Sequence, residues 1–446
     1  MFSLPPSPLL DKTRALARAV KPLGGRALLV GGFVRDALLG QSPKDADVEV
    51  YGLEADVLKT VLQTLGRVDV VGESFRVLKL VWHAKNPETG ARERFELDVS
   101  LPRRDRKIGT GHKGFEVEGD PFASVEDAAR RRDFTLNAIL CDPLTGEILD
   151  PFGGRADLDA RLLRAVDARH FGEDSLRVLR AMQFAARFEL SIEPQTVAIC
   201  RAIPLADLPR ERVWGEWEKW LLKSKRPSVG LHAGREIGVF GRLSPFLETA
   251  LERRENEIGA ALDRAALQIQ ELELPEQVAL MLAVLGSFLG WRDTKRLLDD
   301  LGVFRMKGAR EAVDVRSLVI KLVGARKTPS DWFRRADSLQ DKDFRFFAAR
   351  VPPQLALKLT RARGFEPAAD WFERRLREAD VEFGPPKALL QGRHLIEMGW
   401  KPGPQFGTIC QRVYLLQLSG EVTNLEEAKG VAQSLQANDS GMQVPD

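Results

Sequence analysis

The chain has 446 residues, which corresponds to about three domains at roughly 150 residues each. Hydrophobic residues make up 44% and charged residues 29% of the sequence, an ordinary composition for a folded protein that excludes a largely disordered chain. The net charge of +3 is the small difference between 67 basic and 64 acidic residues. Bulk charge therefore indicates no particular partner, although clusters of arginine can still contact a polyanion.

Cysteine usage and hydropathy favour a cytoplasmic location. The cysteines, Cys141, Cys200 and Cys410, lie far apart and form no CxxC pair, which fits a reducing compartment. No apolar run reaches about 18 residues, and the longest, at 278–289, is better explained as a buried helix than as a membrane span. The N-terminus lacks the charged, apolar and small-residue order of a secretory signal. We therefore expect a cytoplasmic protein that does not enter a membrane.

The first 165 residues mix strand and helix patterns. Apolar runs and alternating residues predict strands, which are expected at 26–31, 47–51, 75–82 and 95–101. Helical spacing predicts helices at 34–39 and 54–65. A Pro-Leu-Thr-Gly turn between residues 137–141 and 147–150 predicts a hairpin. These elements indicate an α+β region built on a mixed sheet.

Strand patterns stop beyond residue 167. Helices are predicted at 173–188, 193–202, 210–223 and 227–236, and amphipathic helices continue through 245–380. Prolines then punctuate the chain, and a closing helix is expected at about 424–436 before a frayed end at 437–446. The second part of the chain is therefore predicted to be all-α.

The densest chemistry lies within residues 28–51. A buried strand ends in Gly31-Gly32 and runs directly into a helix that carries Arg35. Glycines let backbone N–H groups approach an anion, a helix N-terminus favours negative charge, and an arginine can bind phosphate oxygens with two N–H groups. Taken alone, this pattern is more typical of a tight turn followed by a surface arginine.

Three carboxylates strengthen the interpretation as a phosphate-transfer site. Asp45 and Asp47 stand two residues apart on an extended segment, so both face the same side and can bind one hard cation such as Mg²⁺. Asp98, on another predicted strand, is a third. Three carboxylates can hold two ions about 3.5–4 Å apart, one activating a hydroxyl and one holding a leaving pyrophosphate. A lone DxD is usually a capping pair, but together with the upstream GGxxRD it indicates nucleotidyl transfer.

The ordered motifs resemble a known family. LVGGFVRDALLG followed by KDADVEVYG resembles the head motif of the class II tRNA nucleotidyltransferases, or CCA-adding enzymes, whose superfamily includes the bacterial poly(A) polymerases. Four further motifs follow in the same order: RRDFTLNA at 131–138, DPFGG at 150–154, EDSLRVLRA at 173–181 and ERVWGEWEK at 211–219. A weaker match lies within 389–407. The resemblance is therefore much more specific than any one motif.

This resemblance implies a domain order. It implies a catalytic, polymerase-β-like nucleotidyltransferase head at 1–165 and an all-α neck at 166–240 that recognises the nucleotide base. A helical body at 241–380 and a helical, tRNA-binding tail at 381–446 follow.

The resemblance also implies roles for residues of the head. Asp45, Asp47 and Asp98 match the catalytic carboxylates and metal ligands. The matching nucleotide-binding residues are Gly31, Gly32, Arg35 and Arg132 for the triphosphate and Asp133 and Asn137 for the ribose. A local ion pair between Arg132 and Asp133 is the structural alternative.

Asp174 and Arg177 are predicted to select the base. They lie three residues apart on a predicted helix, so an ordinary ion pair is the alternative. Cytosine and adenine each offer an amino donor beside a ring-nitrogen acceptor, which a carboxylate and a guanidinium complement, whereas uracil and guanine reverse this order. In the family this motif is the protein template, and Arg180 adds a nucleotide contact. Relatives commonly carry arginine where this chain has Gln183, which Arg187 or Arg130 could compensate.

The remaining basic segments are either ordinary solvent-exposed surface or parts of the functional site. Residues 103–114 (RRDRKIGTGHKG) form either a solvated loop or the family's flexible loop, which takes part in moving from CTP to ATP. Arginine clusters recur through the helical part, at 305–316, 334–335, 361–363 and 374–377. Each alone is typical of a solvated helix face, but after such a head they can follow tRNA phosphates. No histidine is followed by aspartate, so no phosphohydrolase activity and no zinc or nickel site is expected.

The expected activity is Mg²⁺-dependent addition of C, C and A to the 3′ end of tRNA from CTP and ATP, with release of pyrophosphate. The alternatives are an enzyme on the same scaffold that adds only A or poly(A), and an inactive RNA-binding module. The three intact carboxylates argue against the inactive module. The sequence does not indicate an oligomeric state.

Overall fold

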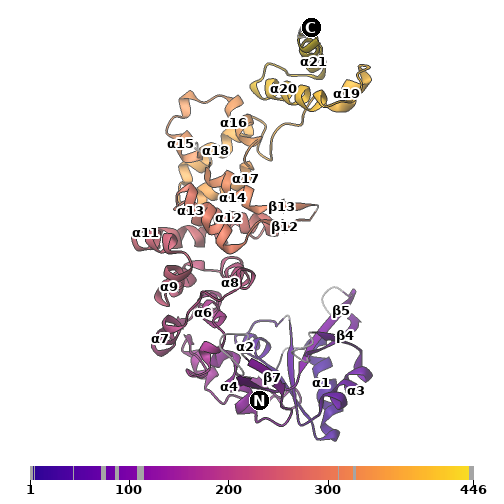
Figure 1. Ribbon diagram of the computed structural model, residues 1–446, viewed down its shortest axis with the longest axis vertical. Helices are drawn as coiled ribbons and strands as arrows, with labels where there is room; N and C mark the ends of the chain where they lie inside the picture. The colour runs from indigo at the N-terminus through magenta and orange to yellow at the C-terminus, as the bar shows by residue number, and fades with distance from the viewer. Residues whose placement is uncertain are drawn as a thin grey trace. The chain divides into compact units, whose positions relative to one another are not determined.

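The computed structural model (Figure 1) describes residues 4, 6–43, 45–71, 77–85, 90–107, 115–309, 311–324 and 328–440. The chain divides into two compact units. The first contains Met1–Trp220 and Val229–Pro245, and the second contains Leu221–Ser228 and Phe246–Asp446. The first unit therefore holds the whole predicted head and most of the predicted neck, while the finer boundaries at 165, 240 and 380 stay predictions.

A seven-stranded mixed sheet forms the centre of the first unit. Its strand order is β3-β4-β5-β2-β1-β8-β9. The strands are β1 (Arg26–Val30), β2 (Asp47–Tyr51), β3 (Arg67–Val71), β4 (Val77–Lys85), β5 (Arg92–Ser100), β8 (Leu140–Cys141) and β9 (Ile148–Leu149). Strands β2 and β5 pair in parallel, and the other neighbours pair antiparallel. The mixed sheet predicted from the sequence is confirmed.

Burial follows the two strand patterns seen in the sequence. In β1 every residue after Arg26 is buried, because this strand lies inside the sheet. In β2 Val48 and Val50 are fully buried while the alternate residues Asp47 and Glu49 are not, since neighbouring side chains point to opposite faces. The buried valines thus anchor the strand in the core, and Asp47 and Glu49 lie on the opposite face of the sheet.

Helices α1, α2 and α3 pack against strands of the sheet (Figure 1). Helix α1 (Pro8–Val20) begins where the Ser7 side chain accepts a hydrogen bond from the Leu10 N–H, with proline at the first helical position. It packs on β1, β5 and helix α3 (Ala55–Leu65). Helix α2 (Gly32–Leu38) follows β1 directly, as predicted.

Some strands in the structure were not predicted. Strand β3 extends the sheet at its edge, and β6 (Arg103–Lys107), at the start of the segment interpreted as a loop, pairs antiparallel with β7 (Phe115–Gly119), which follows that segment. A second hairpin, β12 (Arg305–Lys307) with β13 (Ala312–Asp314), shows that strands do not stop at residue 167. The short parallel pair β10 (Leu162–Leu163) and β11 (Ser191–Ile192) crosses the same boundary. These strands are short, and each lies at the edge of the sheet or pairs only within its own hairpin or two-stranded pair, so a short polar–apolar alternation such as RVDVV in β3 did not mark them. Residues 108–114 of the predicted loop lie outside the described residues.

The helix predicted to begin at residue 173 begins later. A 3-10 turn, η3 (Phe171–Glu173), comes first, and α6 spans Leu176–Phe188. Asp174 is extended, and its Oδ1 atom accepts a hydrogen bond from the Leu176 N–H (3.1 Å). A side chain that binds the backbone two residues ahead favours a turn over a helix. Asp174 is therefore a cap before α6 and does not belong to its first turn.

Helices predicted at 193–202, 210–223 and 227–236 are confirmed to within one residue at each end, and the region predicted to be helical beyond 245 consists mainly of helices. In the first unit and at its boundary they are α7 (Pro194–Ala202), α8 (Arg210–Lys223) and α9 (Pro227–Glu236). The second unit contains α12 (Leu274–Gly286), α13 (Trp291–Leu301), α14 (Val315–Gly324), α15 (Pro329–Phe333), α16 (Asp341–Ala348), α17 (Pro353–Ala362), α18 (Glu366–Glu378), α19 (Gly392–Glu397), α20 (Gln405–Ser419) and α21 (Leu425–Ser440). Helix α11 (Pro245–Ala266) bends at Arg254, where the backbone leaves the helical region.

Two of these helices test specific expectations. Helix α12 contains most of the longest apolar run, and it is buried from Val278 to Leu285, as predicted for a core helix. In the part of the chain that is described, no helix combines the length and the hydropathy that a membrane span requires. The closing helix, α21, runs on to Ser440, beyond the predicted end.

Gly154 provides a test of the packing beneath the DPFGG motif. It is the first residue of α5 (Gly154–Asp159), and Asp150 caps this helix by accepting the N–H groups of Gly154 (2.7 Å) and Arg155 (2.9 Å). A Cβ atom on Gly154 would lie 2.2 Å from the Thr135 carbonyl oxygen. We expect Gly154→Ala to lower the free energy of unfolding by about 1–3 kcal/mol, as overpacking does.

Urea unfolding followed by tryptophan fluorescence measures this change. Gly215, inside helix α8, is the matched control because a Cβ atom there meets nothing within 4 Å. Gly215→Ala should raise the free energy of unfolding by up to about 1 kcal/mol. Equal effects of the two substitutions would contradict the predicted clash.

Candidate active site

The sheet brings the three predicted carboxylates to neighbouring strands. In the parallel pair formed by β2 and β5, Asp47 stands opposite Asp98 in register. The backbone N–H of Asp98 donates to the carbonyl of Ala46 (3.3 Å), which lies between Asp45 and Asp47. A carboxylate from a distant part of the chain thus joins the Asp45–Asp47 pair.

The charges around Asp47 describe a site that favours a cation. Burial raises the pKa of the Asp47 carboxyl, Asp98 raises it further, Arg132 opposes the change, and Asp45 and Glu49 add to it. Among the described residues, no three His, Cys, Asp or Glu side chains are grouped closely enough to enclose a metal ion. The three carboxylates do not surround a metal ion on their own. Such a site fits Mg²⁺, which takes several of its ligands from water or phosphate.

Lys79 is a residue of this region that the sequence analysis missed. It lies opposite Asp98 in the pairing of β4 with β5. Its Nζ atom is 2.8 Å from a Glu96 oxygen and 3.3 Å from Asp98 Oδ1, and these hydrogen bonds raise the pKa of Lys79. The ammonium group therefore balances part of the negative charge. No motif marks it, because the contact depends on strand register.

The Gly31-Gly32 turn lies beside a predicted triphosphate residue. Gly31 has φ of 64° and ψ of −126°, a conformation open to glycine alone, and a Cβ atom there would lie 3.1 Å from Arg132 Nη1. Arg132 Nη2 donates to Glu49 (2.6 Å), and its buried Nε atom has no hydrogen-bond partner. Arg132 therefore pairs with Glu49 of β2, and Asp133 pairs with Arg180, so the suggested local ion pair between Arg132 and Asp133 is wrong.

Arg35 is inside the protein, although it was predicted to bind the triphosphate. It is 5% exposed. Its Nε and Nη2 atoms contact Asp36 (2.8 and 2.6 Å), and Nη1 donates to Asn137 Oδ1 (2.6 Å). Its guanidinium also lies over the rings of Phe184 and Phe188. Its direct role toward phosphate stays a prediction, and the structure gives it a set of internal contacts.

Asp133 and Asn137, the predicted ribose residues, belong to one buried network. Asn137 donates to Asp133 Oδ1 (2.9 Å), and Arg180 donates to Asp133 Oδ2 (2.6 Å). Burial by itself raises the pKa of the Asp133 carboxyl, but Arg180 and the hydrogen bonds from Asn137 and Phe134 outweigh it, so the pKa lies below its ordinary value. The carboxylate stays ionised and holds α6 to the head.

The predicted base-selecting pair does not form an ion pair with itself. Asp174 Oδ2 accepts from Arg212 on α8 (2.9 Å). Arg177 donates to the backbone carbonyls of His170 (2.8 Å) and Arg131 (2.7 Å). Burial lowers the pKa of Arg177, although its guanidinium remains charged. Arg212 was not predicted as a site residue, but it is the second residue of the ERVWGEWEK motif, which marked it in the sequence.

The position of Gln183 bears on the departure from the family pattern. Gln183 is 1% exposed, and its Oε1 atom has no hydrogen-bond partner. Arg187, one turn further along α6, lies over Phe188 (5.1 Å). Arg130 pairs with Glu126 (2.6 Å) on its own helix. Two arginines were suggested to compensate for Gln183. Of these, Arg187 lies on α6, the helix that also carries Arg177 and Arg180.

Several arginines of the helical part are held by acidic partners. Arg361 pairs with Glu373 (2.8 Å), Arg375 with Asp341 (2.9 Å) and Arg316 with Asp299 (2.9 Å). Such pairs favour the interpretation of these clusters as solvated faces. Arg305, on the exposed β12 hairpin, lies beside Phe304, which is 50% exposed.

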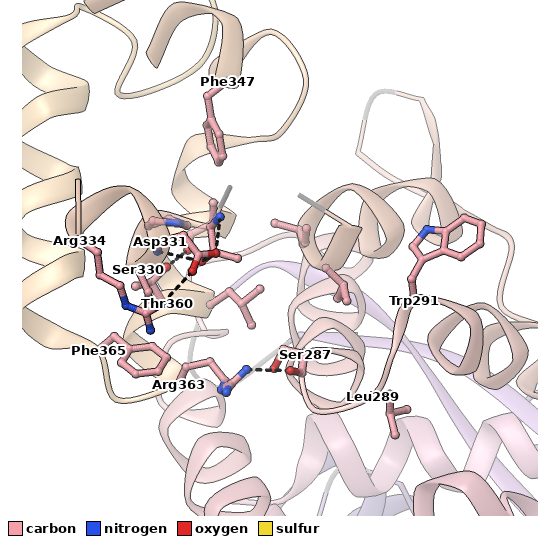
Figure 2. A pocket seen from close by; sticks show the side chains of 16 residues that line it. Ser287, Leu289, Trp291, Ser330, Asp331, Arg334, Phe347, Thr360, Arg363 and Phe365 are labelled. Carbon is pink, nitrogen blue, oxygen red and sulfur yellow. Dashed lines mark hydrogen bonds and ion pairs between the residues drawn. The ribbon is translucent and has the colours of Figure 1, made fainter. Parts of the chain in front are cut away.

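The second unit also contains a cavity of about 320 Å³ (Figure 2). Figure 2 shows Arg363 at its wall, where it donates to the Ser287 carbonyl (2.9 Å), and Arg334 beside Asp331 (3.2 Å). Trp291, Phe347 and Phe365 supply aromatic surface. None of the predicted catalytic or nucleotide-binding residues lines this cavity.

Comparison with known proteins agrees with a nucleotidyltransferase head followed by a helical region. Residues 27–164 match the family described as "Poly A polymerase head domain". The fold is that of the CCA-adding enzymes. The Bacillus stearothermophilus enzyme in complex with CTP superposes with a TM-score of 0.64 at 20% identity, over 98% of this chain and 100% of that one. The Thermotoga maritima enzyme complexed with tRNA gives 0.63 at 20% identity, over 97% of each chain.

Curated relatives extend the comparison to the sequence. The multifunctional CCA protein of Stenotrophomonas maltophilia (strain K279a) is 39% identical over 227 residues, 49% of this chain and 51% of that protein. That of Xylella fastidiosa (strain M23) is 39% identical over 229 residues, half of each chain. The chain spans about half the length of the curated relatives it matches. These findings confirm the resemblance to the tRNA nucleotidyltransferase family.

Proposed function

We propose that this protein is a CCA-adding tRNA nucleotidyltransferase. It adds C, C and A to the 3′ end of tRNA in the cytoplasm, uses CTP and ATP, and releases pyrophosphate. The observation that carries this proposal is the register of β2 and β5, which sets Asp47 opposite Asp98 next to Asp45. The head-domain match and the names of the relatives support it.

The carboxylates are proposed to hold divalent metal, with Mg²⁺ as the ion. Asp45, Asp47 and Asp98 are its ligands. Burial raises the pKa of Asp47, and the neighbouring Asp98 and Asp45 raise it further, so a cation here would relieve the repulsion among the carboxylates. When bound, Mg²⁺ lowers the pKa of the attacking ribose hydroxyl and stabilises charge on the phosphates. Gly31, Gly32 and Arg132 are proposed to face the triphosphate.

Base selection is proposed to belong to the start of α6. The Asp174 carboxylate accepts from the amino group of cytosine or adenine, and Arg177 donates to the ring nitrogen. In the structure Asp174 is paired with Arg212, and Arg177 donates to the His170 and Arg131 carbonyls. A base that binds here takes the place of these partners. Asp133, Asn137 and Arg180 shape the ribose side of the same site. These partners keep the charges paired until a nucleotide enters.

Three RNA substrates distinguish full CCA addition from its alternatives. They are tRNA lacking CCA, tRNA ending in CC, and a generic RNA, each incubated with CTP, ATP or both. We expect C and then A on the first, A alone on the second, and little product on the third. Addition of A only to the CC end would identify an A-adding enzyme, and long A tracts on generic RNA would identify a poly(A) polymerase.

Binding of tRNA should fall steeply with salt. Each neutralised phosphate releases counterions, so a protein that contacts about six phosphates loses roughly 10³-fold in affinity between about 50 and 200 mM salt. Deleting the chain beyond about residue 380 should weaken tRNA binding more than nucleotide binding, since the tail is proposed to bind tRNA. Electrophoretic mobility shift at graded salt measures the first effect. Salt-independent binding, or a deletion without effect, would remove the tail from the RNA site.

A further inference from the structure

Arg35 lies against two stacked rings of helix α6. Its Cζ atom is 4.3 Å from the centre of the Phe188 ring and 5.3 Å from that of Phe184. The two rings stack on each other at 5.7 Å with their planes 17° apart. Arg180 and Arg187 of the same helix lie over these rings as well, at 5.1 Å from Phe184 and from Phe188 respectively. One cation from the Gly31-Gly32 turn region thus joins two guanidinium groups of α6 around a stacked pair of rings.

A second route links Arg35 to the same helix. Arg35 donates to Asn137 (2.6 Å), Asn137 donates to Asp133 (2.9 Å), and Arg180 donates to Asp133 (2.6 Å). Arg35, Asn137 and Asp133 are 5%, 6% and 8% exposed. Hydrogen bonds between charged groups are stronger away from water, so both routes connect α2 firmly to α6.

These contacts leave Arg35 poorly placed to bind a phosphate from solvent. Each of its guanidinium nitrogens contacts Asp36 or Asn137. A phosphate ligand at this position would have to displace the half-buried Asp36 carboxylate or the buried Asn137 amide. The arrangement is better suited to holding α6 in place than to contacting the triphosphate.

We propose that Arg35 is a positioning residue that, through Phe184 and Phe188 in the second half of α6 and through the Asn137–Asp133–Arg180 hydrogen bonds, fixes this helix relative to the Gly31-Gly32 turn. The helix carries Arg177 in its first turn and Asp174 just before it. Fixing α6 therefore holds the base-recognition groups at a set distance from the place where the triphosphate is proposed to lie. This inference rests on the proposed function, because it assumes that Asp174 and Arg177 read the base.

Equilibrium binding without RNA provides the test. The affinities of CTP, ATP, UTP, GTP and inorganic tripolyphosphate are measured by calorimetry for the wild type and for Phe188→Leu, Phe188→Tyr and Arg35→Met. Phe188→Leu removes the ring face but keeps an apolar side chain, and Phe188→Tyr restores the ring. Phe240→Leu is the matched control, because Phe240 is fully buried and packs on Trp217 and Trp220.

We expect Phe188→Leu and Arg35→Met to reduce the preference for CTP over UTP by roughly 2- to 30-fold, the range of one cation–π contact. Tripolyphosphate affinity should stay unchanged, and Phe188→Tyr and Phe240→Leu should keep the wild-type preference. If Arg35→Met weakens tripolyphosphate while base preference is intact, Arg35 is a phosphate ligand and the inference is overturned. It is also overturned if Phe188→Leu behaves like Phe240→Leu, a comparison that remains decisive if Arg35→Met does not fold.

A tRNA-extension assay of the wild type, run beside the binding measurements, separates this inference from the proposed function. Wild-type protein that prefers CTP and ATP in binding but adds nothing to tRNA would contradict the proposed function and leave the positioning role in place. Wild-type protein that extends tRNA, together with an unchanged base preference in Phe188→Leu, would contradict the positioning role alone.

Discussion

Asp47→Asn is expected to reduce nucleotide incorporation by about 100-fold or more, while tRNA binding stays largely intact. The substitution keeps the shape of the side chain but removes a negative charge that is proposed to hold the metal ion. Loss of an electrostatic clamp on the transition state costs on the order of several kcal/mol. Asp45→Asn is expected to act in the same way. Incorporation of labelled CTP into tRNA lacking its CCA end, at saturating Mg²⁺, measures the effect.

Asp69→Asn is the matched control for these substitutions. Asp69 lies on the edge strand β3, where it pairs with Arg67 (2.8 Å) and stands opposite Lys79, and strand β4 separates it from Asp98. Its substitution should leave turnover unchanged. Chelation of divalent metal should abolish activity in the wild type, and added Mg²⁺ should restore it. Near-wild-type turnover of Asp47→Asn or Asp45→Asn in Mg²⁺ would show that the metal assignment is wrong.

Substitution of the base-selecting pair should change which nucleotide is used. Asp174→Ala removes the acceptor for the amino group of C and A and the charge that repels the carbonyl oxygens of U and G. Arg177→Ala removes the donor to the ring nitrogen. Each should narrow the preference for CTP and ATP over UTP and GTP by roughly 1–3 kcal/mol, about 10- to 150-fold. Single-nucleotide incorporation with each of the four NTPs measures this.

The double variant and Arg212→Ala sharpen this test. The effects of Asp174→Ala and Arg177→Ala should be non-additive, because the two residues act as one recognition unit. Arg212→Ala removes the partner of Asp174 but leaves the Asp174 carboxylate. The preference for CTP and ATP over UTP and GTP should therefore fall less in Arg212→Ala than in Asp174→Ala. If the alanine variants lose rate uniformly and still reject UTP and GTP, Asp174 and Arg177 only hold the start of α6 to the backbone carbonyls of His170 and Arg131.

Elements that carry a buried face were predictable from the sequence, and strands at the edge of the sheet or outside it were not. The predicted range of β2 is exact, because Val48 and Val50 alternate with polar residues on a strand buried on one side. Helices α8 and α9 also match their predicted ranges. Strand β3 and the hairpins β6–β7 and β12–β13 were missed, since they lie at an edge or pair only with each other. The later start of α6 depends on one side-chain hydrogen bond at Asp174.

The sequence by itself determined the chemical types at the candidate site and the order of the elements that carry them. The Asp45–Asp47 spacing, the Gly31-Gly32 turn and the residues around Asp174 follow from local patterns, because spacing along one segment decides which side chains share a face. Only the tertiary structure decided the partners. Lys79 with Asp98, Arg212 with Asp174 and Arg35 with Phe188 are contacts between elements far apart in the chain. Such contacts form over about 3–5 Å and depend on strand register and helix packing, which no local pattern records.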